Sequence, residues 1–554
     1  MIFNVLTLLS LTALTSGKPV ARSLELHESR DTIPSGFKLT GPAPADTTLD
    51  LRLALTSSDT DGLIQALYSK RLLNKAPQAN QYLAPTQNSV AVVNEWLSGN
   101  GISATTISSA GNWLAVSVPV SLANEVLDAN FSIFTHEGSG QQSIRTLSYS
   151  IPSELKGHLD LIHPTVSFAS PIPKSPMRAT KYNGTVQPKS AAQPSACQDD
   201  EVDPACLQAL YGIPTTPATE SSSYLVVTGY SQSPSPSDLE LFYSNYGMSE
   251  SANLTYSVIE IDGGDYDPSD PGDEADLDIQ YTIGLATNVP VTFMSVGVDT
   301  SDGVFGFLDT ANYFLNEDSP PSVITTSYGD NEDLFSASVQ NNLCNAYAAL
   351  GARGVSILFA SGDAGVSGFV TGTSCTDFVP SFPSGCPYLT SVGATTGSSP
   401  ETGASLSAGG FSNVFSRPSF QSSAVEAYLE YLGDTYSGLY NASGRGYPDV
   451  SAQGDNFLIA WGGEFYTIDG TSCSTPTVAS VISLINDRLV AAGMSTLGWL
   501  NPFLYSTGLS AFTDITSGDN PGCNTNGFSA TTGWDPITGV GTPVFSDLLT
   551  AVGL

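Results

Sequence analysis

A nucleophile can be supplied by the segment 469–476, which reads DGTSCSTP. The apolar run 478–490 follows it and predicts a long buried helix. Ser472 would then stand in the first turn of that helix, where backbone N–H groups have no intrahelical partner and the helix dipole favours negative charge. This position suits a nucleophilic serine. The alternative is that Ser472 or Ser474 only caps the helix, and this segment alone does not exclude it.

Histidine is missing from most of the chain. All four histidines, at positions 27, 136, 158 and 163, precede residue 190, as does every lysine. If the N-terminal part is removed on maturation, the remainder can form no Ser-His-Asp triad, no Cys-His pair and no histidine-based zinc site. The Gly-x-Ser-x-Gly motif is also absent from the sequence. The base for Ser472 must therefore be a carboxylate.

Two carboxyl groups at helical spacing are candidates for that base. Glu274 and Asp278 belong to segment 272–280 (GDEADLDIQ), which predicts a helix. Because they are four residues apart, both project from one face, whereas Asp276 projects from roughly the opposite face. Like charges at this spacing push the two proton affinities apart, as an acid-range general base requires. The alternative is that an acidic first turn only complements the helix dipole.

A third carboxyl group follows a predicted strand. In segment 357–365 (ILFASGDAG) an apolar strand runs into Ser-Gly-Asp. Asp363 would therefore stand at the carboxyl end of a parallel sheet, where α/β proteins place their sites. A loop aspartate is also a common turn former. Each of the three signals is weak alone, and together they indicate a site built from a serine and carboxylates.

The elements that must position these residues form a regular alternation after about residue 204. We expect strands at 224–230, 256–261, 291–296, 323–327, 356–360 and 388–392. Helices are expected between them at 237–246, 274–286, 304–315 and 337–350. This alternation predicts a parallel sheet covered by helices on both faces.

Composition divides the 554-residue chain into four parts. Residues 1–17 read as a secretory signal peptide, apolar but too short to span a membrane. Residues 18–170 read as a small mixed α/β unit, with strands at 49–55, 113–120 and 131–135 and helices at 60–73 and 89–99. The Pro- and Ser-rich stretch 171–200 reads as an exposed linker suited to proteolytic processing, and 201–554 is the main domain.

The charge of the chain restricts its partners. From Ala196 onward there are 40 Asp and Glu residues against four Arg. Such a surface repels nucleic acid and anionic membranes, and it suits an acidic medium in which many carboxylates are protonated. Glycosylation is compatible with four Asn-x-Ser/Thr sequons, at Asn130, Asn183, Asn253 and Asn441. We expect a secreted, extracellular, monomeric protein that binds neither nucleic acid nor membranes.

Three motifs together resemble the sedolisin, or serine-carboxyl, peptidases. They are GTSxSxP at 470–476, EAxLDxQY at 274–281 and SGD at 361–363. Within that family the chain is similar to the secreted fungal tripeptidyl peptidases. The resemblance implies an α/β fold, in which a subtilisin-like parallel sheet flanked by helices follows a small α+β ferredoxin-like prodomain. It covers nearly everything after the signal peptide.

The resemblance also implies a role for each site residue. Ser472 would be the nucleophile, Glu274 its base, Asp278 the residue that orients Glu274 and shares a proton with it, and Asp363 the donor to the oxyanion. Because only a protonated Asp363 can donate, we expect an acid optimum and a steep loss of activity toward neutral pH. The edge 327–329 is expected to pair with substrate as an added strand and to open the S1 pocket.

The C-terminal segment 512–536 resembles the calcium loop of the family. One Ca²⁺ would be held by oxygen atoms, as this hard cation prefers. The implied ligands are the carboxylates of Asp514 and Asp535 and the carbonyls of Ile515, Thr531 and Gly533. From the residues alone these would be ordinary turn formers. The acidic loop 262–273 lacks EF-hand spacing, and we expect it to be solvated, with a possible substrate-facing edge.

All seven cysteines follow residue 196, which in a secreted chain predicts three disulfides and one leftover thiol. We expect the pairs Cys197–Cys206, Cys375–Cys523 and Cys344–Cys386. Cys473 would be a buried spectator, because it lacks a histidine to activate it. The segment 372–375 repeats the letters GTSC but precedes no helix, so we interpret it as a loop that carries a disulfide cysteine.

These expectations combine into one hypothesis. The chain would be a secreted, acid-acting serine peptidase that releases tripeptides from free N-termini of peptides and proteins through an acyl-enzyme, with its own prodomain as intramolecular inhibitor or chaperone. One alternative is an acid endopeptidase that uses the same catalytic residues. Another is a calcium-stabilised binding protein without catalytic activity.

Overall fold

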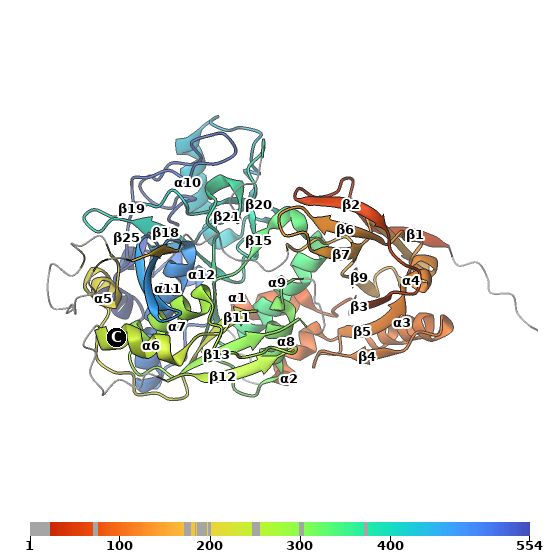
Figure 1. Cartoon of the computed structure of the whole chain (residues 1–554), viewed down its shortest axis with the longest axis horizontal. Helices are drawn as coiled ribbons and strands as arrows, with labels where there is room; N and C mark the ends of the chain where they lie inside the picture. The colour runs from red at the N-terminus through yellow and green to blue at the C-terminus, as the bar shows by residue number, and fades with distance from the viewer. Residues whose placement is uncertain are drawn as a thin grey trace, which may run out of the picture.

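The computed structural model describes residues 23–69, 76–170, 179–182, 184, 197, 201–245, 255–298, 304–369 and 375–554. The expected signal peptide, most of the expected linker and the sequons at Asn183 and Asn253 lie outside these residues. Two bodies lie side by side, an N-terminal domain in red and orange and a larger main domain in yellow to blue (Figure 1). Among the described helices, none has the length and apolarity needed to cross a membrane.

The main domain is built on one eight-stranded sheet. Its strands follow the order β12-β13-β11-β14-β16-β18-β19, and β22 also pairs with β18. All neighbours are parallel except β18 and β19. The strands are β11 (Leu225–Tyr230), β12 (Ser257–Ile261), β13 (Val291–Val296), β14 (Val323–Thr326), β16 (Ser356–Ala360), β18 (Thr390–Thr396), β19 (Thr402–Gly403) and β22 (Val450–Gln453). The predicted parallel sheet is confirmed.

Helices cover both faces of this sheet (Figure 1). On β11, Leu225 and Val227 join a core that includes residues of α7 and α11, while Val226 between them joins a second core with residues of α8 and α9. This alternation follows from the period of two in a strand, and it explains why the strands are apolar without interruption. The helices are α6 (Pro236–Asn245), α7 (Asp273–Leu285), α8 (Phe307–Asn316), α9 (Ala337–Ala352) and α11 (Thr471–Ala491).

Several shorter elements of the main domain were not predicted. The hairpin β23–β24 packs beside α6 and α7, and β15 pairs with β17. These elements have two to eleven residues and lie within polar or Gly-rich stretches, where no hydrophobic periodicity can be recognised. They are α5 (Pro204–Tyr211), β15 (Asp330–Asn331), β17 (Ser381–Phe382), β20 (Gly410–Ser416), α10 (Ser422–Leu432), β21 (Gly444–Tyr447), β23 (Phe457–Trp461), β24 (Glu464–Ile468), α12 (Asn501–Leu504), β25 (Phe512–Thr513), β26 (Thr542–Pro543) and α13 (Phe545–Ala551).

The N-terminal domain has an antiparallel sheet in the order β4-β5-β3-β9 and two smaller sheets, β2-β6-β7 and β1-β8. Its strands are β1 (Leu24–Ser29), β2 (Phe37–Pro42), β3 (Thr48–Leu55), β4 (Ala104–Thr106), β5 (Trp113–Pro119), β6 (Ser132–His136), β7 (Gln142–Arg145), β8 (Ser148–Pro152) and β9 (Leu159–His163). Its helices are α1 (Thr60–Tyr68), α2 (Ala76–Leu83), α3 (Gln87–Gly99) and α4 (Val120–Leu127). The helix expected at 60–73 is described only as far as Tyr68.

The two domains share a hydrophobic core. Leu63 and Leu67 of α1 pack in one cluster with Leu343 and Leu350 of α9. A bidentate ion pair crosses the same boundary: the Arg52 guanidinium donates to Asp309 Oδ1 at 2.7 Å and to Oδ2 at 2.9 Å. This contact combines buried apolar area with a well-oriented charge pair, so the N-terminal domain is firmly docked.

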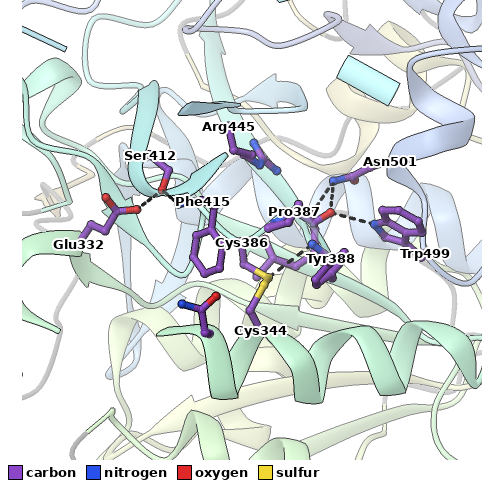
Figure 2. Close-up of a disulfide and its surroundings, with 12 residues drawn as sticks. Glu332, Cys344, Cys386, Pro387, Tyr388, Ser412, Phe415, Arg445, Trp499 and Asn501 are labelled. Carbon is purple, nitrogen blue, oxygen red and sulfur yellow. Dashed lines mark hydrogen bonds between the residues drawn. A yellow bond between two sulfur atoms is a disulfide. The ribbon is translucent and has the colours of Figure 1, made fainter. Parts of the chain in front are cut away.

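All three predicted disulfides are confirmed, between Cys197 and Cys206, Cys344 and Cys386, and Cys375 and Cys523. Cys473 has a buried free thiol, as expected. In Figure 2 the bond between Cys344 and Cys386 joins α9 to the loop before β18. Of the segment 372–375, only Cys375 lies within the described residues.

Candidate active site

Ser472 stands in the first turn of α11 and is fully buried. Its Oγ donates a hydrogen bond to Glu274 Oε2 over 3.0 Å. The residue before the helix is Gly470, which makes no side-chain cap, and Ser474 Oγ bonds the carbonyls of Ala452 and Gln453 instead. The alternative that either serine only caps the helix is therefore wrong.

Glu274 is the second residue of α7, and a side chain from another segment fixes that end of the helix. Gln232 Oε1 accepts from the backbone N–H of Glu274 at 3.1 Å and of Ala275 at 3.3 Å. Because it satisfies N–H groups that have no intrahelical partner, Gln232 holds the first turn in place. The sequence contains no local pattern that identifies Gln232, and we did not predict it.

Asp278 lies one turn further along α7 and accepts from Ser327 Oγ over 2.9 Å. Ser327 directly follows β14, and its Oγ is also 3.5 Å from the Ser472 carbonyl oxygen. The structure thus brings Glu274, Asp278, Ser327 and Ser472 together. Asp276 points away from this group and accepts from Ser235 N–H at 2.8 Å, which confirms the predicted orientation.

Burial decides the protonation of the two carboxyl groups beside Ser472. It raises the pKa of Glu274 well above its usual value, and the charges of Asp278 and Asp273 raise it further. Burial also raises the pKa of Asp278, against the hydrogen bond from Ser327. Two such carboxyl groups cannot both ionise readily, so the pair keeps at least one proton over a wide pH range. Where it keeps only one, it carries one negative charge, which can accept a proton from Ser472.

Asp363 approaches the same helix terminus from the sheet. Its Oδ1 accepts from Thr471 N–H at 2.7 Å and from Thr471 Oγ1 at 2.8 Å. A Cβ added at Gly470 would lie 3.0 Å from Asp363 Oδ2, so glycine at this position leaves room for the carboxyl group. Gly362 has φ +111°, in the region that favours glycine, and it turns the chain after β16. Asp363 therefore lies at the carboxyl end of the sheet, as predicted.

The described site offers a hydroxyl group hydrogen-bonded to a buried carboxyl group, a second carboxyl group one helical turn away, and a third at the terminus of a helix. No histidine takes part, because all four lie in the N-terminal part of the sequence. The hydrogen bond from Ser472 to Glu274 replaces the Ser-His contact of the familiar triad. This arrangement can perform acyl transfer with a carboxylate as the base.

Comparisons with known proteins show the family of the chain. The family description "Pro-kumamolisin, activation domain" matches residues 35–168, and "Subtilase family" matches 267–496. The chain is 32% identical to tripeptidyl-peptidase SED2 of Arthroderma otae, over 97% of this chain and 98% of that protein. It is 34% identical to probable tripeptidyl-peptidase SED3 of Trichophyton verrucosum, over 94% of each.

The chain belongs to the sedolisin family of serine-carboxyl peptidases. Among solved structures, Pseudomonas sedolisin, a serine-carboxyl proteinase, matches this fold with a TM-score of 0.51. The match covers 64% of this chain and 98% of that one, at 22% identity, and it supports the subtilisin-like fold. The resemblance recognised in the three motifs is thus confirmed.

The C-terminal loop of this sedolisin brings two carboxyl groups to one turn. Gly533 N–H donates to Asp514 Oδ2 at 2.9 Å, and Thr531 N–H lies 3.3 Å from Asp535 Oδ2. Asp535 is fully buried, and burial raises its pKa to about 7. Within the described residues no Lys, Arg or His forms an ion pair with Asp514 or Asp535. Asp535 Oδ1 also accepts from Ile537 N–H at 3.0 Å and from Thr538 N–H at 2.9 Å, so hydrogen bonds already engage this carboxyl group. Two carboxyl groups at one turn are nevertheless the kind of oxygen ligand that a hard cation prefers.

Other buried carboxyl groups make this sedolisin sensitive to pH. Burial raises the pKa of Asp330 to about 6, of Glu332 to about 7 and of Asp276 to about 9. The folded chain therefore keeps protons that the unfolded chain releases near pH 4. Because the folded state binds more protons, the free energy of unfolding is largest below about pH 4 and falls as the pH rises through about 6 to 9.

We expect the melting temperature of the full chain to fall steadily between about pH 4 and about pH 8. One pKa unit corresponds to about 1.4 kcal/mol, so ionisation of Glu332 alone costs roughly 3 kcal/mol. Calorimetry at several pH values measures this fall, and Glu332→Gln should make it shallower because Gln does not ionise. A melting temperature that stays level across the same range would contradict the prediction.

Proposed function

We propose that this sedolisin is a secreted, acid-acting tripeptidyl peptidase that works through an acyl-enzyme. The observation that carries the proposal is the 3.0 Å hydrogen bond from Ser472 Oγ to Glu274 Oε2 in a buried site. Tripeptide release is supported by the names of relatives that match nearly the whole chain. The charge distribution, with 40 acidic residues against four Arg from Ala196 onward, supports work in an acidic medium.

In the acylation step, Ser472 Oγ attacks the carbonyl carbon of the scissile peptide bond. Its proton passes to Glu274 Oε2, which already accepts the hydrogen bond. The tetrahedral intermediate then collapses, the C–N bond breaks, and Glu274 returns the proton to the leaving amine. Water attacks the ester in the second half of the reaction, again with Glu274 as the base, and releases the acyl fragment and Ser472.

In these steps Asp278 supports the base Glu274, and Asp363 stabilises the negative charge of the oxyanion. Asp278, oriented by Ser327, shares the proton of the pair and keeps Glu274 turned toward Ser472. Asp363 is proposed to donate a proton from its carboxyl group to the oxyanion, with the Ser472 backbone N–H as the second donor. Its Oδ1 accepts from the N–H and the hydroxyl of Thr471, which orients the carboxyl group at the terminus of α11.

The test is mass spectrometry of products from one long peptide, offered with a free and with an acetylated N-terminus at about pH 4, where the α-amino group is protonated. The tripeptidyl peptidase releases successive three-residue fragments from the free form alone. Internal cuts in both forms would indicate an acid endopeptidase on the same residues. No cleavage by a processed, calcium-loaded sample would leave a non-catalytic binding protein, which the Ser472–Glu274 contact argues against.

We also propose that one Ca²⁺ is held in the C-terminal loop 512–536. The carboxylates of Asp514 and Asp535 and the carbonyls of Ile515, Thr531 and Gly533 would hold it, and its role would be structural. The ion would compensate the buried charge of Asp535. A disulfide joins Cys523 of this loop to Cys375, which follows Asp363 in the sequence. A bound ion that fixes the loop would therefore also help to fix the segment of Asp363.

Removing calcium is expected to lower the melting temperature by several degrees. Ligand at a hundred times its dissociation constant stabilises the folded state by about 2.7 kcal/mol. The measurement is a thermal melt with calcium and with a chelator, and Asp514→Asn should melt like the chelated protein. Asp519→Asn is the matched control, because Asp519 is an exposed carboxylate of the same loop that bonds Ser529. Equal melting temperatures with and without calcium would rule the site out.

The N-terminal domain is proposed to act as an intramolecular inhibitor of the main domain or as a chaperone for its folding. Its match to an activation domain supports this role, and so do the shared core and the Arg52–Asp309 ion pair. Secretion rests on the sequence of residues 1–17, and three disulfides are compatible with an oxidising compartment. The edge 327–329 keeps its proposed role as the strand that receives substrate.

A further inference from the structure

The end of the N-terminal domain lies along the edge where we expect substrate to bind. Ser336 N–H donates to Ser167 Oγ, Phe168 N–H to the Leu334 carbonyl, and Ser170 N–H to Asp330 Oδ2. As the residue numbers rise from 167 to 170, the numbers of their hydrogen-bond partners fall from 336 to 330. Segment 167–170 therefore follows residues 336 to 330 in the antiparallel sense, in the direction of Ser327 and the catalytic pair.

Asp330 is an unusual partner for this segment. It forms β15 with Asn331, on the side of the main domain that faces the N-terminal domain (Figure 1). Its side chain is 1% exposed, Oδ1 accepts from its own neighbour Asn331, and Oδ2 accepts from Ser170 N–H at 2.9 Å. Burial, the largest influence, raises the pKa of this carboxyl group to about 6, against the hydrogen bonds it receives. A cation near Oδ2 would favour the ionised form.

The spacing along the chain from Ser327 to Asp330 corresponds to three residues of peptide. Ser327 marks the catalytic end of the edge, because its Oγ contacts both Asp278 and the Ser472 carbonyl. Asp330 is three residues further along the chain. An extended peptide beside this edge advances about 3.3 Å per residue, so three residues span about 10 Å. A peptide whose third carbonyl meets Ser472 would place its N-terminus level with Asp330.

We propose that Asp330 binds the α-ammonium group of the substrate and so sets the length of the released fragment at three residues. In the full chain, Ser170 N–H occupies the position that the ammonium takes once the N-terminal domain has left. The ligand class is a peptide with a free, protonated N-terminus. This inference rests on the proposed tripeptidyl activity and adds the residue that explains it.

Neighbouring carboxyl groups are already engaged or exposed. Glu332 bonds Ser412 Oγ, as Figure 2 shows, and it also accepts from Asn413 N–H at 2.7 Å. Both of its partners belong to the main domain, so Glu332 joins two segments of that domain. Asp333 is exposed, and its backbone carbonyl accepts from Arg30 of the N-terminal domain. Within the described part of the chain, the hydrogen bond that Asp330 Oδ2 accepts comes from Ser170, in the segment that leaves with the N-terminal domain.

The test compares Asp330→Asn with Asp333→Asn, a matched loss of one charge three residues away. Each variant is expressed as the full chain, processed in acid, and its intact active sites are counted with a fluorophosphonate reagent. Substrates are one peptide with a free and with an acetylated N-terminus, at about pH 4, where the α-ammonium is charged. The readouts are kcat and KM for each peptide and the lengths of the fragments.

Loss of a hydrogen bond to a charged group predicts that Asp330→Asn lowers kcat/KM for the free peptide by about ten- to hundred-fold, mainly through KM. The acetylated peptide should remain as poor a substrate as it is for the parent, fragments of mixed length should appear from the free peptide, and Asp333→Asn should behave like the parent. Asp330→Ser, which keeps an oxygen beside Asn331 N–H, is the second variant and should show the same loss.

Unchanged selectivity in either Asp330 variant would overturn the inference and leave Asp330 as a contact of the full chain only. If the parent itself cleaves free and acetylated peptides alike, the proposed tripeptidyl activity fails instead, and that result is visible before any variant is made. The two failures are therefore distinguishable. Recovery of selectivity in Asp330→Glu, which restores the charge, would support the ammonium contact over a purely steric role.

Discussion

Glu274→Gln is expected to lower kcat by about 10³- to 10⁴-fold, because the amide cannot accept the proton of Ser472. Gln has the shape of Glu and can still accept a hydrogen bond from Ser472 Oγ through its carbonyl oxygen, so the site should remain assembled. The loss should appear in kcat rather than in KM, because proton transfer belongs to the transition state. Steady-state kinetics on a free peptide measures both constants.

The matched control for this variant is Asp273→Asn, on the preceding residue of the same helix. Asp273 Oδ1 accepts from the Glu274 N–H at 3.0 Å, and its charge raises the pKa of Glu274. Removing that charge should move the acidic limb of the pH–activity profile to lower pH by a small amount, with kcat nearly unchanged. If Glu274→Gln retained more than about a tenth of the activity, a general base worth 10²- to 10⁴-fold could not be assigned to Glu274.

Much of the fold could be predicted because a parallel sheet covered on both faces leaves a strong signal. The strands at 291–296 and 356–360 have the predicted bounds, since each is an apolar run with a core on either side. Elements such as β15 and β23 were missed. They are short, and their pairing with β17 and β24 depends on contacts that no local period records.

The site residues also fall into those that sequence patterns predict and those that only the fold shows. Glu274 and Asp278 could be found because helical spacing alone puts them on one face, and Ser472 because it opens an apolar helix. Contacts that join distant segments could not be found, such as Ser327 with Asp278 across 49 residues. Gln232, which holds the first turn of α7 from 42 residues away, carries no sequence signal of this kind.

Thr471 is a different case, because it lies inside a motif that we had recognised. Its N–H and its hydroxyl both bond Asp363 Oδ1, so the threonine of Gly-Thr-Ser orients the third carboxyl group. The sequence placed Thr471 next to the nucleophile, but only the fold shows that Asp363 reaches it from the end of β16. This short motif therefore contains both the proposed nucleophile, Ser472, and the residue that positions the proposed donor, Thr471.

Replacement of that donor is expected to have the second largest effect. Asp363→Ala should lower kcat by about 10²- to 10³-fold, which is the usual cost of one lost oxyanion donor. Asp363→Asn is more informative, because its carbonyl oxygen can face Thr471 while its NH₂ group lies where Oδ2 now stands. An amide donates at every pH, whereas a carboxyl group donates only while protonated.

We therefore expect the parent to lose activity steeply toward neutral pH and Asp363→Asn to lose much less of its own activity over the same range. The measurement is kcat for both proteins between about pH 3 and about pH 6, where carboxyl groups titrate and the folded state is still stable. Parallel profiles for the two proteins would show that the alkaline limb belongs to another group. In that case the carboxyl pair of Glu274 and Asp278, whose pKa values burial also raises, would be the next source to examine.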